Sequence, residues 1–290
     1  MRMVILGCGY SGTAIAKAAL AVGAAVTGTA RTGDKAQALD QRGISGLIFD
    51  GSALSNALGV ELAEATHLVQ SIPPGPGGDP LLNLTHGRLR EFFPKLQWIG
   101  YLSTVGVYGD AGGGWVDEDS PCNPKPGRSQ ERVEAEALWL AEGETATVPV
   151  AVLRLAGIYG PGRNAFVNLT RGSARRIVKK DQVFNRIRVE DIADATLFLA
   201  KAGQGGIFNI TDDEPAPPQD VIAYAAVLMG VEPPPEQAFE NADMTPMARS
   251  FYGSNKKVSN RRIRELGYRF RFPDYRNSLA ELWSTGRWER

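Results

Sequence analysis

A glycine-rich turn between an apolar strand pattern and an alanine-rich helix pattern constrains this chain more than any other feature. The turn reads Gly7-Cys8-Gly9-Tyr10-Ser11-Gly12 and separates residues 3–6 from residues 13–21. In a strand–turn–helix unit of this spacing, the first glycine permits the tight turn. The second leaves room for a pyrophosphate, and the third lets helix and strand pack closely. The helix N-terminus offers N–H groups and a favourable dipole to a phosphate. We expect a dinucleotide at Gly7, Gly9, Tyr10, Ser11 and Gly12; the alternative is a turn that binds nothing.

The first half of the chain alternates short apolar runs with longer helical patterns, which is typical of a parallel sheet covered by helices on both faces. Strands are predicted near residues 3–6, 25–29, 46–49, 66–71, 98–103 and 149–155. Helices are predicted at 11–22, 34–42, 52–64, 79–93 and 129–142, and a further helix and strand at 189–201 and 206–210. We therefore expect an α/β fold with a doubly wound parallel sheet (Rossmann fold) and a smaller C-terminal lobe.

The predicted domain boundaries follow from where this alternation weakens. Residues 1–160 plus 187–212 are expected to form the dinucleotide-binding domain, and residues 161–186 and 213–290 the smaller substrate lobe.

Composition excludes several classes of partner. The 290 residues are 43% apolar, and 32 basic residues balance 32 acidic ones, so the overall charge favours neither nucleic acid nor a membrane surface. With only two cysteines and no apolar run of signal-peptide or membrane-spanning length, the sequence predicts a soluble, cytoplasmic protein. Neither His67 nor His86 has a cysteine or carboxylate at metal-ligand spacing, so no metal site is expected.

Residues at the ends of the next strands bear on the choice of nucleotide. At the end of the second strand, where an acidic residue usually bonds the ribose hydroxyls of NAD, this chain has Thr29-Ala30-Arg31-Thr32. Arg31 suits a 2′-phosphate, which favours NADP over NAD, although it can also be an ordinary exposed arginine. Asp50, after the third strand, is either a partner for the adenine edge or a loop cap. Ser71, at the end of the fourth strand, is placed with the cofactor-binding residues.

A second motif follows the fifth predicted strand. Ser103-Thr104-Val105-Gly106-Val107-Tyr108-Gly109 resembles the S-[ST]-x-x-V-Y-G signature of extended short-chain dehydrogenases/reductases, which include epimerases, dehydratases and reductases. The resemblance continues through Arg154-Leu155-Ala156-Gly157-Ile158-Tyr159-Gly160-Pro161-Gly162 and Val189-Glu190-Asp191-Ile192-Ala193. It implies that Thr104 is the catalytic hydroxyl that bonds the substrate oxygen; a strand-end hydroxyl that satisfies nearby backbone is the alternative.

The sequence departs from this family at its acid/base pair. Family members carry Y-x-x-x-K, often Y-G-x-S-K, at the start of the next helix, where the lysine lowers the pKa of the tyrosine. Aligned on Gly127 and Ser129, the tyrosine position holds Pro126 and the lysine position Gln130. Proline has no titratable group and glutamine no charge, so neither can perform the original chemistry. The pattern resembles the atypical subgroup of the family, which keeps the fold and nucleotide turn without the pair.

Two functions follow from this reading. The first is an NADP-dependent oxidoreductase, epimerase or dehydratase for a small carbonyl, hydroxyl or sugar-nucleotide substrate, with Thr104 on the substrate. The second is a non-catalytic NADP-binding sensor or scaffold. The substrate stays unidentified, and a homodimer through the helix containing Val133, Ala137 and Leu140 is compatible with the sequence, as is a monomer.

Overall fold

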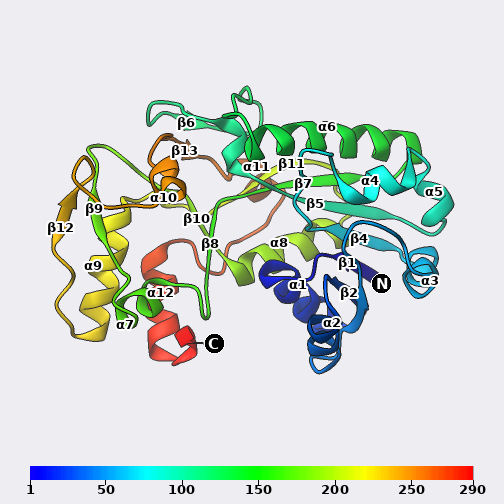
Figure 1. Ribbon diagram of the computed structural model, residues 1–290, viewed down its shortest axis with the longest axis horizontal. Helices are drawn as coiled ribbons and strands as arrows, with labels where there is room; N and C mark the ends of the chain where they lie inside the picture. Colours follow the sequence, from blue (N-terminus) through cyan, green and yellow to red (C-terminus); the bar gives the residue numbers. More distant parts are fainter. Residues whose placement is uncertain (290) are drawn as a thin grey trace. The chain divides into compact units, whose positions relative to one another are not determined.

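The chain contains a seven-stranded sheet (Figure 1). The computed structural model describes residues 1–289. The strand order is β11-β7-β5-β4-β1-β2-β3, and the neighbours from β3 to β7 pair in parallel. The strands are β1 (Arg2–Leu6), β2 (Ala25–Ala30), β3 (Ser45–Ile48), β4 (His67–Gln70), β5 (Trp98–Thr104), β7 (Val150–Leu155) and β11 (Gly206–Ile210). The order reverses between β1 and β4, which in open α/β sheets is where a ligand binds.

Helices cover both faces of this sheet. They are α1 (Tyr10–Ala21), α2 (Gly33–Asp40), α3 (Asn56–Glu64), α4 (Pro80–Thr85), α5 (Leu89–Phe92), α6 (Arg128–Ala146) and α8 (Val189–Lys201). Side chains of α3 to α6, including Leu58 and Trp139, share one buried cluster with Val4 and Leu6 of β1. Figure 1 shows α1 and α8 on the side of the sheet opposite α6. The predicted doubly wound Rossmann sheet is confirmed.

The predicted elements lie close to the observed ones, with one exception. The helix expected over residues 79–93 is divided into α4 and α5, because His86 and Gly87 adopt positive φ angles of 48° and 73° and end α4. Asp79 begins α4: its carboxylate accepts from the N–H groups of Leu81 and Leu82, and Pro80 fills the first helical position.

The chain divides into two compact units. Unit 1 contains Met1–Val107, Pro124–Leu155 and Ile192–Phe208; unit 2 contains Tyr108–Asn123, Ala156–Asp191 and Asn209–Arg290. The sequence-based division assigned residues 108–123, 156–160, 187–191 and 209–212 to the dinucleotide-binding part, whereas they pack with unit 2. The functional assignment of the two parts stays a prediction.

Unit 2 is built from short elements around an aromatic and aliphatic core. They are β6 (Trp115–Val116), β8 (Gly157–Tyr159), α7 (Ala165–Thr170), β9 (Arg176–Val178), β10 (Arg186–Arg188), α9 (Pro218–Met229), β12 (Glu236–Ala238), α10 (Pro246–Phe251), β13 (Lys257–Val258), α11 (Arg261–Glu265), α12 (Tyr275–Ser284) and η2 (Arg287–Glu289). The short helix η1 (Val105–Tyr108) lies mostly in unit 1. Strands pair in parallel as β8–β10, β9–β12 and β6–β13. Phe166 of α7, Ala225 of α9 and Leu279 of α12 share the core.

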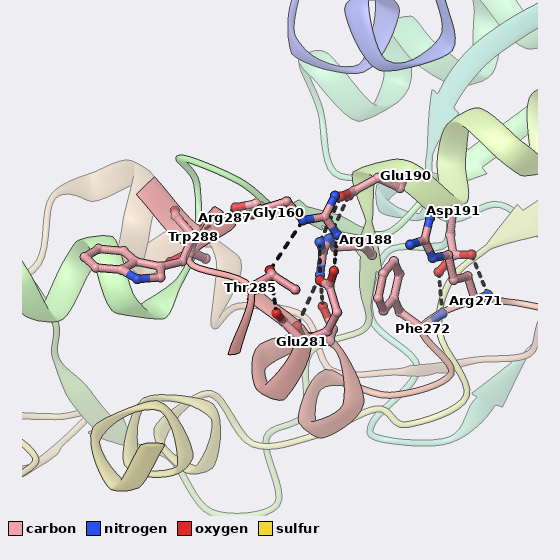
Figure 2. Close-up of polar contacts among 12 residues, drawn as sticks. Gly160, Arg188, Glu190, Asp191, Arg271, Phe272, Glu281, Thr285, Arg287 and Trp288 are labelled. Carbon is pink, nitrogen blue, oxygen red and sulfur yellow. Dashed lines mark hydrogen bonds and ion pairs between the residues drawn. The ribbon is translucent and has the colours of Figure 1, made fainter. Parts of the chain in front are cut away.

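A fully buried arginine joins the C-terminal helix to β10 within unit 2 (Figure 2). Arg188 forms ion pairs with Glu190 at 2.7 Å and Glu281 at 3.0 Å, and donates to the Ser278 hydroxyl at 2.9 Å. Its guanidinium also lies over the ring of Phe272. The buried charge is thus fully paired, which is the condition for burying a guanidinium at acceptable cost.

Candidate nucleotide-binding and active site

The first turn of unit 1 is anchored to the end of β2. Gly7 has a φ of +79°, and a Cβ there would lie 2.7 Å from Ile72 Cγ1. The Gly7 N–H donates to Thr29 Oγ1 at 2.9 Å, and the Cys8 N–H donates to the Thr29 carbonyl at 2.8 Å. Only glycine fits the position of Gly7, and the turn is held in place by β2.

Gly12 and Gly9 differ in what the protein itself requires of them. A Cβ on Gly12 would lie 3.0 Å from the Gly7 carbonyl oxygen and 3.2 Å from Ile5 Cγ2, so the close approach of α1 to β1 needs glycine. At Gly9, where φ is −83°, a Cβ would meet nothing nearer than the Gly7 oxygen at 4.0 Å. Packing therefore explains Gly12, whereas the open face at Gly9 leaves the backbone accessible to a ligand.

The N-terminus of α1 points its positive dipole end at this open face. Gly9 is the N-cap and supplies no side-chain oxygen, and the first turn of α1 contains no acidic residue. Tyr10 is 36% exposed, while the Ser11 side chain is buried. The dipole of a twelve-residue helix is left for an anion to neutralise.

Three further predicted residues follow the strands beside this turn. Arg31 directly follows β2 and is exposed, and Thr32 is the N-cap of α2 without a side-chain cap bond. Asp50 accepts hydrogen bonds from the Ser52 N–H at 2.9 Å and the Ser52 hydroxyl at 2.6 Å, which hold the pKa of its carboxyl below the usual range. Asp50 thus caps its own loop. Ser71 is half-buried. Its N–H donates to the Leu6 carbonyl at 2.9 Å, which places it beside the end of β1.

Thr104 completes the predicted set at the end of β5. It is half-buried, and its Oγ1 accepts a hydrogen bond from the Gly106 N–H at 3.0 Å. The strands that precede the predicted residues are β1, β2, β3, β4 and β5, which are neighbours in a parallel sheet. The carboxyl ends of parallel strands meet at one edge, so the fold brings all the predicted residues to the same edge of unit 1.

Helix α6 holds the two positions aligned with the family's tyrosine and lysine. Pro126 is exposed and precedes the helix. The Gln130 amide is exposed and donates to Glu134 at 3.0 Å on the next turn of the same helix. Neither residue makes a contact with Thr104 that would replace an acid/base group.

Instead, α6 contacts the end of β5 through Arg132 and Glu136, whose partners the sequence did not predict. Arg132 donates to the Leu102 carbonyl and lies 3.5 Å from the Tyr101 hydroxyl. The Glu136 carboxylate is 3% exposed, accepts from the Ser103 hydroxyl, and pairs with Arg154 at 2.7 Å. Arg154 and Ser103 belong to the motifs quoted above, but no pattern in the sequence indicated that both contact Glu136 of α6.

A buried polar network fixes the loop after β4. The Gln70 amide donates to both Asp79 oxygens, at 2.9 and 3.0 Å, and the Trp139 indole donates to Asp79 Oδ2 at 3.1 Å. Burial raises the pKa of the Asp79 carboxyl, which these hydrogen bonds partly oppose. The network connects β4, α4 and α6 beneath the loop that begins at Ser71.

Residues 1–289 contain neither a candidate metal site nor a candidate membrane-spanning helix. No group of three His, Cys, Asp or Glu side chains in this range is arranged to hold a metal ion. No helix in the same range is long and apolar enough to cross a membrane.

Known proteins resemble this chain over nearly its whole length. Comparison with models of protein families finds no match. Protein YeeZ of Escherichia coli strain K12 is 32% identical over 297 residues, which cover 94% of this chain and 97% of YeeZ. A solved structure of a functionally unknown conserved protein from Silicibacter pomeroyi is 42% identical, with a TM-score of 0.88 over 98% of this chain and 99% of that one. A putative NAD-dependent epimerase/dehydratase from Methylobacillus flagellatus is 27% identical, with a TM-score of 0.71 over 99% and 98% of the two chains.

The chain belongs to the YeeZ family, within the extended short-chain dehydrogenases/reductases. The family resemblance inferred from the turn and the Thr104 motif is therefore confirmed. The residues of unit 1 fit a dinucleotide. Packing within the protein does not require glycine at position 9, and Gly9 lies at the uncapped N-terminus of α1, where a phosphate can approach the backbone.

Proposed function

We propose that this protein binds NADP(H) at the turn Gly7–Gly12 and uses it to act on a small carbonyl, hydroxyl or sugar-nucleotide substrate. The observation that carries the proposal is the accessible backbone at Gly9, beside the uncapped N-terminus of α1. The relative from Methylobacillus flagellatus, described as a putative NAD-dependent epimerase/dehydratase, supports the class of reaction. A bound nicotinamide would supply or accept the hydride.

NADP is proposed over NAD because of the end of β2. Arg31 offers a fixed fork of donors two residues after Thr29, whose hydroxyl and carbonyl hold the turn. The Thr32 hydroxyl at the N-terminus of α2 makes no cap bond and can donate to the same phosphate. Ser71 would contact the nucleotide from the end of β4, and Asp50 the adenine edge through the oxygen that does not cap its loop.

Thr104 would bond the substrate oxygen. Because its Oγ1 already accepts from the Gly106 N–H, its proton is directed elsewhere and can be donated to a ligand. Tyr101 does not replace the missing phenol, since burial raises its pKa to about 12 and Arg132 only partly opposes this. The proton would come from water in such a reaction.

The second candidate, a non-catalytic NADP-binding sensor or scaffold, is favoured by the start of α6. Pro126 and Gln130 provide no titrating group, and Gln130 is engaged with Glu134. Both candidates require nucleotide binding, and for both we propose a cytoplasmic protein that binds neither nucleic acid nor membrane.

The deciding experiment is calorimetric titration with NADPH and NADH. We expect tighter binding of NADPH, loss of that preference in Arg31→Ala, and loss of both nucleotides in Gly9→Val. Arg128→Ala, an exposed arginine outside the turn, is the matched control for charge and should bind as the wild type does. Failure of the wild type to bind either nucleotide would contradict both candidate functions.

A further inference from the structure

Two hydroxyl groups flank a small gap at the end of β5. A Cβ on Gly106 would stand 3.1 Å from Ser129 Oγ and 3.3 Å from Thr104 Oγ1. The φ of Gly106 lies outside the left-handed region, so its backbone conformation does not require glycine. A side chain at position 106 would therefore crowd both hydroxyl groups, and glycine leaves the space beside them unfilled.

The start of α6 places Ser129 at this gap. Gly127, with a φ of 94°, begins the helix, and Ser129 is its second residue. Arg132 and Glu136 follow on the same face at spacings of three and four residues, and both contact β5, at Leu102 and Ser103. Ser129 therefore belongs to the row of side chains that meets the strand ending at Thr104, while Gln130 points to Glu134.

The gap is suited to an oxygen that gains negative charge. Thr104 accepts from the Gly106 N–H and so has its proton free to donate, and no partner of the Ser129 hydroxyl is found among residues 1–289. The guanidinium of Arg132, one turn further along the helix, adds positive potential, whereas Glu131 in the first turn opposes the helix dipole. Preorganised donors of this kind stabilise charge as it develops, without transferring a proton.

We propose that Ser129 is a second substrate-binding hydroxyl, which together with Thr104 holds one carbonyl or hydroxyl oxygen of the substrate. This deepens the proposed function and rests on it for the hydride. A bound dihydronicotinamide would supply the hydride to the carbonyl carbon and would itself be oxidised, so the substrate oxygen would gain negative charge as the C=O π pair moves onto it. Both hydroxyls donate to that oxygen, and water then supplies the proton. The Thr104 and Ser129 hydroxyls would thus stabilise negative charge on the substrate oxygen, whereas the family's tyrosine acts there as an acid or base.

A trivalent arsenical tests the geometry without any nucleotide, because one arsenic atom bonds two thiols only when both can reach it. The double variant Thr104→Cys/Ser129→Cys should bind one equivalent of phenylarsine oxide, keep it against excess 2-mercaptoethanol, and release it to dithiothreitol. The control Thr104→Cys/Gln130→Cys should lose the arsenical to 2-mercaptoethanol, as should each single variant. Equal retention by the two double variants, or none by either, overturns the proposal; circular dichroism confirms that all are folded.

Alkylation connects the gap to the nucleotide. In the single variant Ser129→Cys, a saturating concentration of NADP+ should slow carbamidomethylation of residue 129 at least tenfold, whereas Gln130→Cys should react at an unchanged rate. An unprotected thiol at position 129 in a protein that binds NADP+ by calorimetry contradicts the proposal and leaves the proposed function standing. Arsenical capture in a protein that binds no nucleotide would contradict the proposed function and leave the proposed pairing of residues 104 and 129 standing.

Discussion

At the scale of single residues, the roles of Gly9 and Gly12 in the turn can be separated by their effects on stability. A methyl group at Gly12 would lie 3.0 Å from the Gly7 oxygen, whereas at Gly9 it meets only open space. We expect Gly12→Ala to lower the free energy of unfolding by about 1–3 kcal/mol through overpacking. Gly9→Ala should cost no more than about 1 kcal/mol, the size of an N-cap effect, yet weaken nucleotide binding more than tenfold. Urea denaturation and calorimetry of both variants check this; equal destabilisation would contradict it.

The Glu136–Arg154 pair is a buried contact that helps to hold α6 in place. Both side chains are about 4% exposed, so Glu136→Gln leaves an uncompensated charge in the core. Breaking such a buried pair costs about 3–5 kcal/mol. Lys95→Met breaks an exposed pair with Glu64 at 2.7 Å and is the matched control, for which about 0–1 kcal/mol is expected. An equal loss of unfolding free energy in both variants, measured by urea denaturation, would show that α6 is held by other contacts.

The cysteine in the turn gives a prediction that depends on pH. Burial raises the pKa of the Cys8 thiol, opposed in part by a contact with Thr13, so less thiolate is present at pH 8 than in an ordinary cysteine. Because the thiolate is the reactive form, Cys8 should be alkylated by iodoacetamide more slowly than the partly exposed Cys122, and its rate should rise to higher pH values. Peptide mass spectrometry over pH 7–10 measures both rates. Reaction of Cys8 as fast as Cys122 would show that the turn opens.

At the scale of elements, the sequence predicted β1, α1 and β2 because periodicity and glycine spacing are local signals. It did not predict the break at His86, since a histidine with positive φ has no clear local signature. The network of Gln70, Asp79 and Trp139 was also missed, because its members are brought together by the packing of α6 and not by spacing along the chain.

Helix α6 shows the limit of motif alignment. Matching Gly127 and Ser129 to the family pattern identified what Pro126 and Gln130 lack, but said nothing of which side chains face β5. That information lies in the helical spacing of Arg132 and Glu136, whose partners are known only once the sheet order is known.

We propose a homodimer through the outer side of α6, one of the two states that the sequence allows. Ala137 is exposed and Leu138 is 53% exposed, while Val133 and Leu140 are half-buried. If two copies associate through this face, Leu138→Glu should convert a dimer to a monomer. The free energy of unfolding of the monomer should change by no more than about 0.5 kcal/mol, as is usual for a surface position. Light scattering across a range of concentrations measures the oligomeric state. Lys95→Met is a control distant from the face in the sequence, and a monomeric wild type would contradict the prediction.

At the scale of the whole molecule, the sequence predicted the parallel sheet but not the full extent of unit 2. Residues 108–123 follow a strong strand pattern in the sequence, yet they pack with unit 2, where β6 pairs with β13. Pairing between segments so far apart in the chain leaves no periodic signal in either one.

The predicted nucleotide residues all lie in unit 1, which makes the response to NADPH a test of the whole assignment. A ligand that binds only the folded state stabilises it by RT ln(1 + [L]/Kd), or about 2.7 kcal/mol at 100 times Kd. Hydrogen exchange should therefore slow most in peptides that cover the turn Gly7–Gly12, the end of β2 with Arg31, and the loop after Ser71. The Arg188 cluster of unit 2, already buried and fully paired, serves as the internal comparison and should slow by no more than the global stabilisation requires. Protection confined to the Arg188 cluster would place the nucleotide in unit 2, since exchange reports where local opening has become costlier.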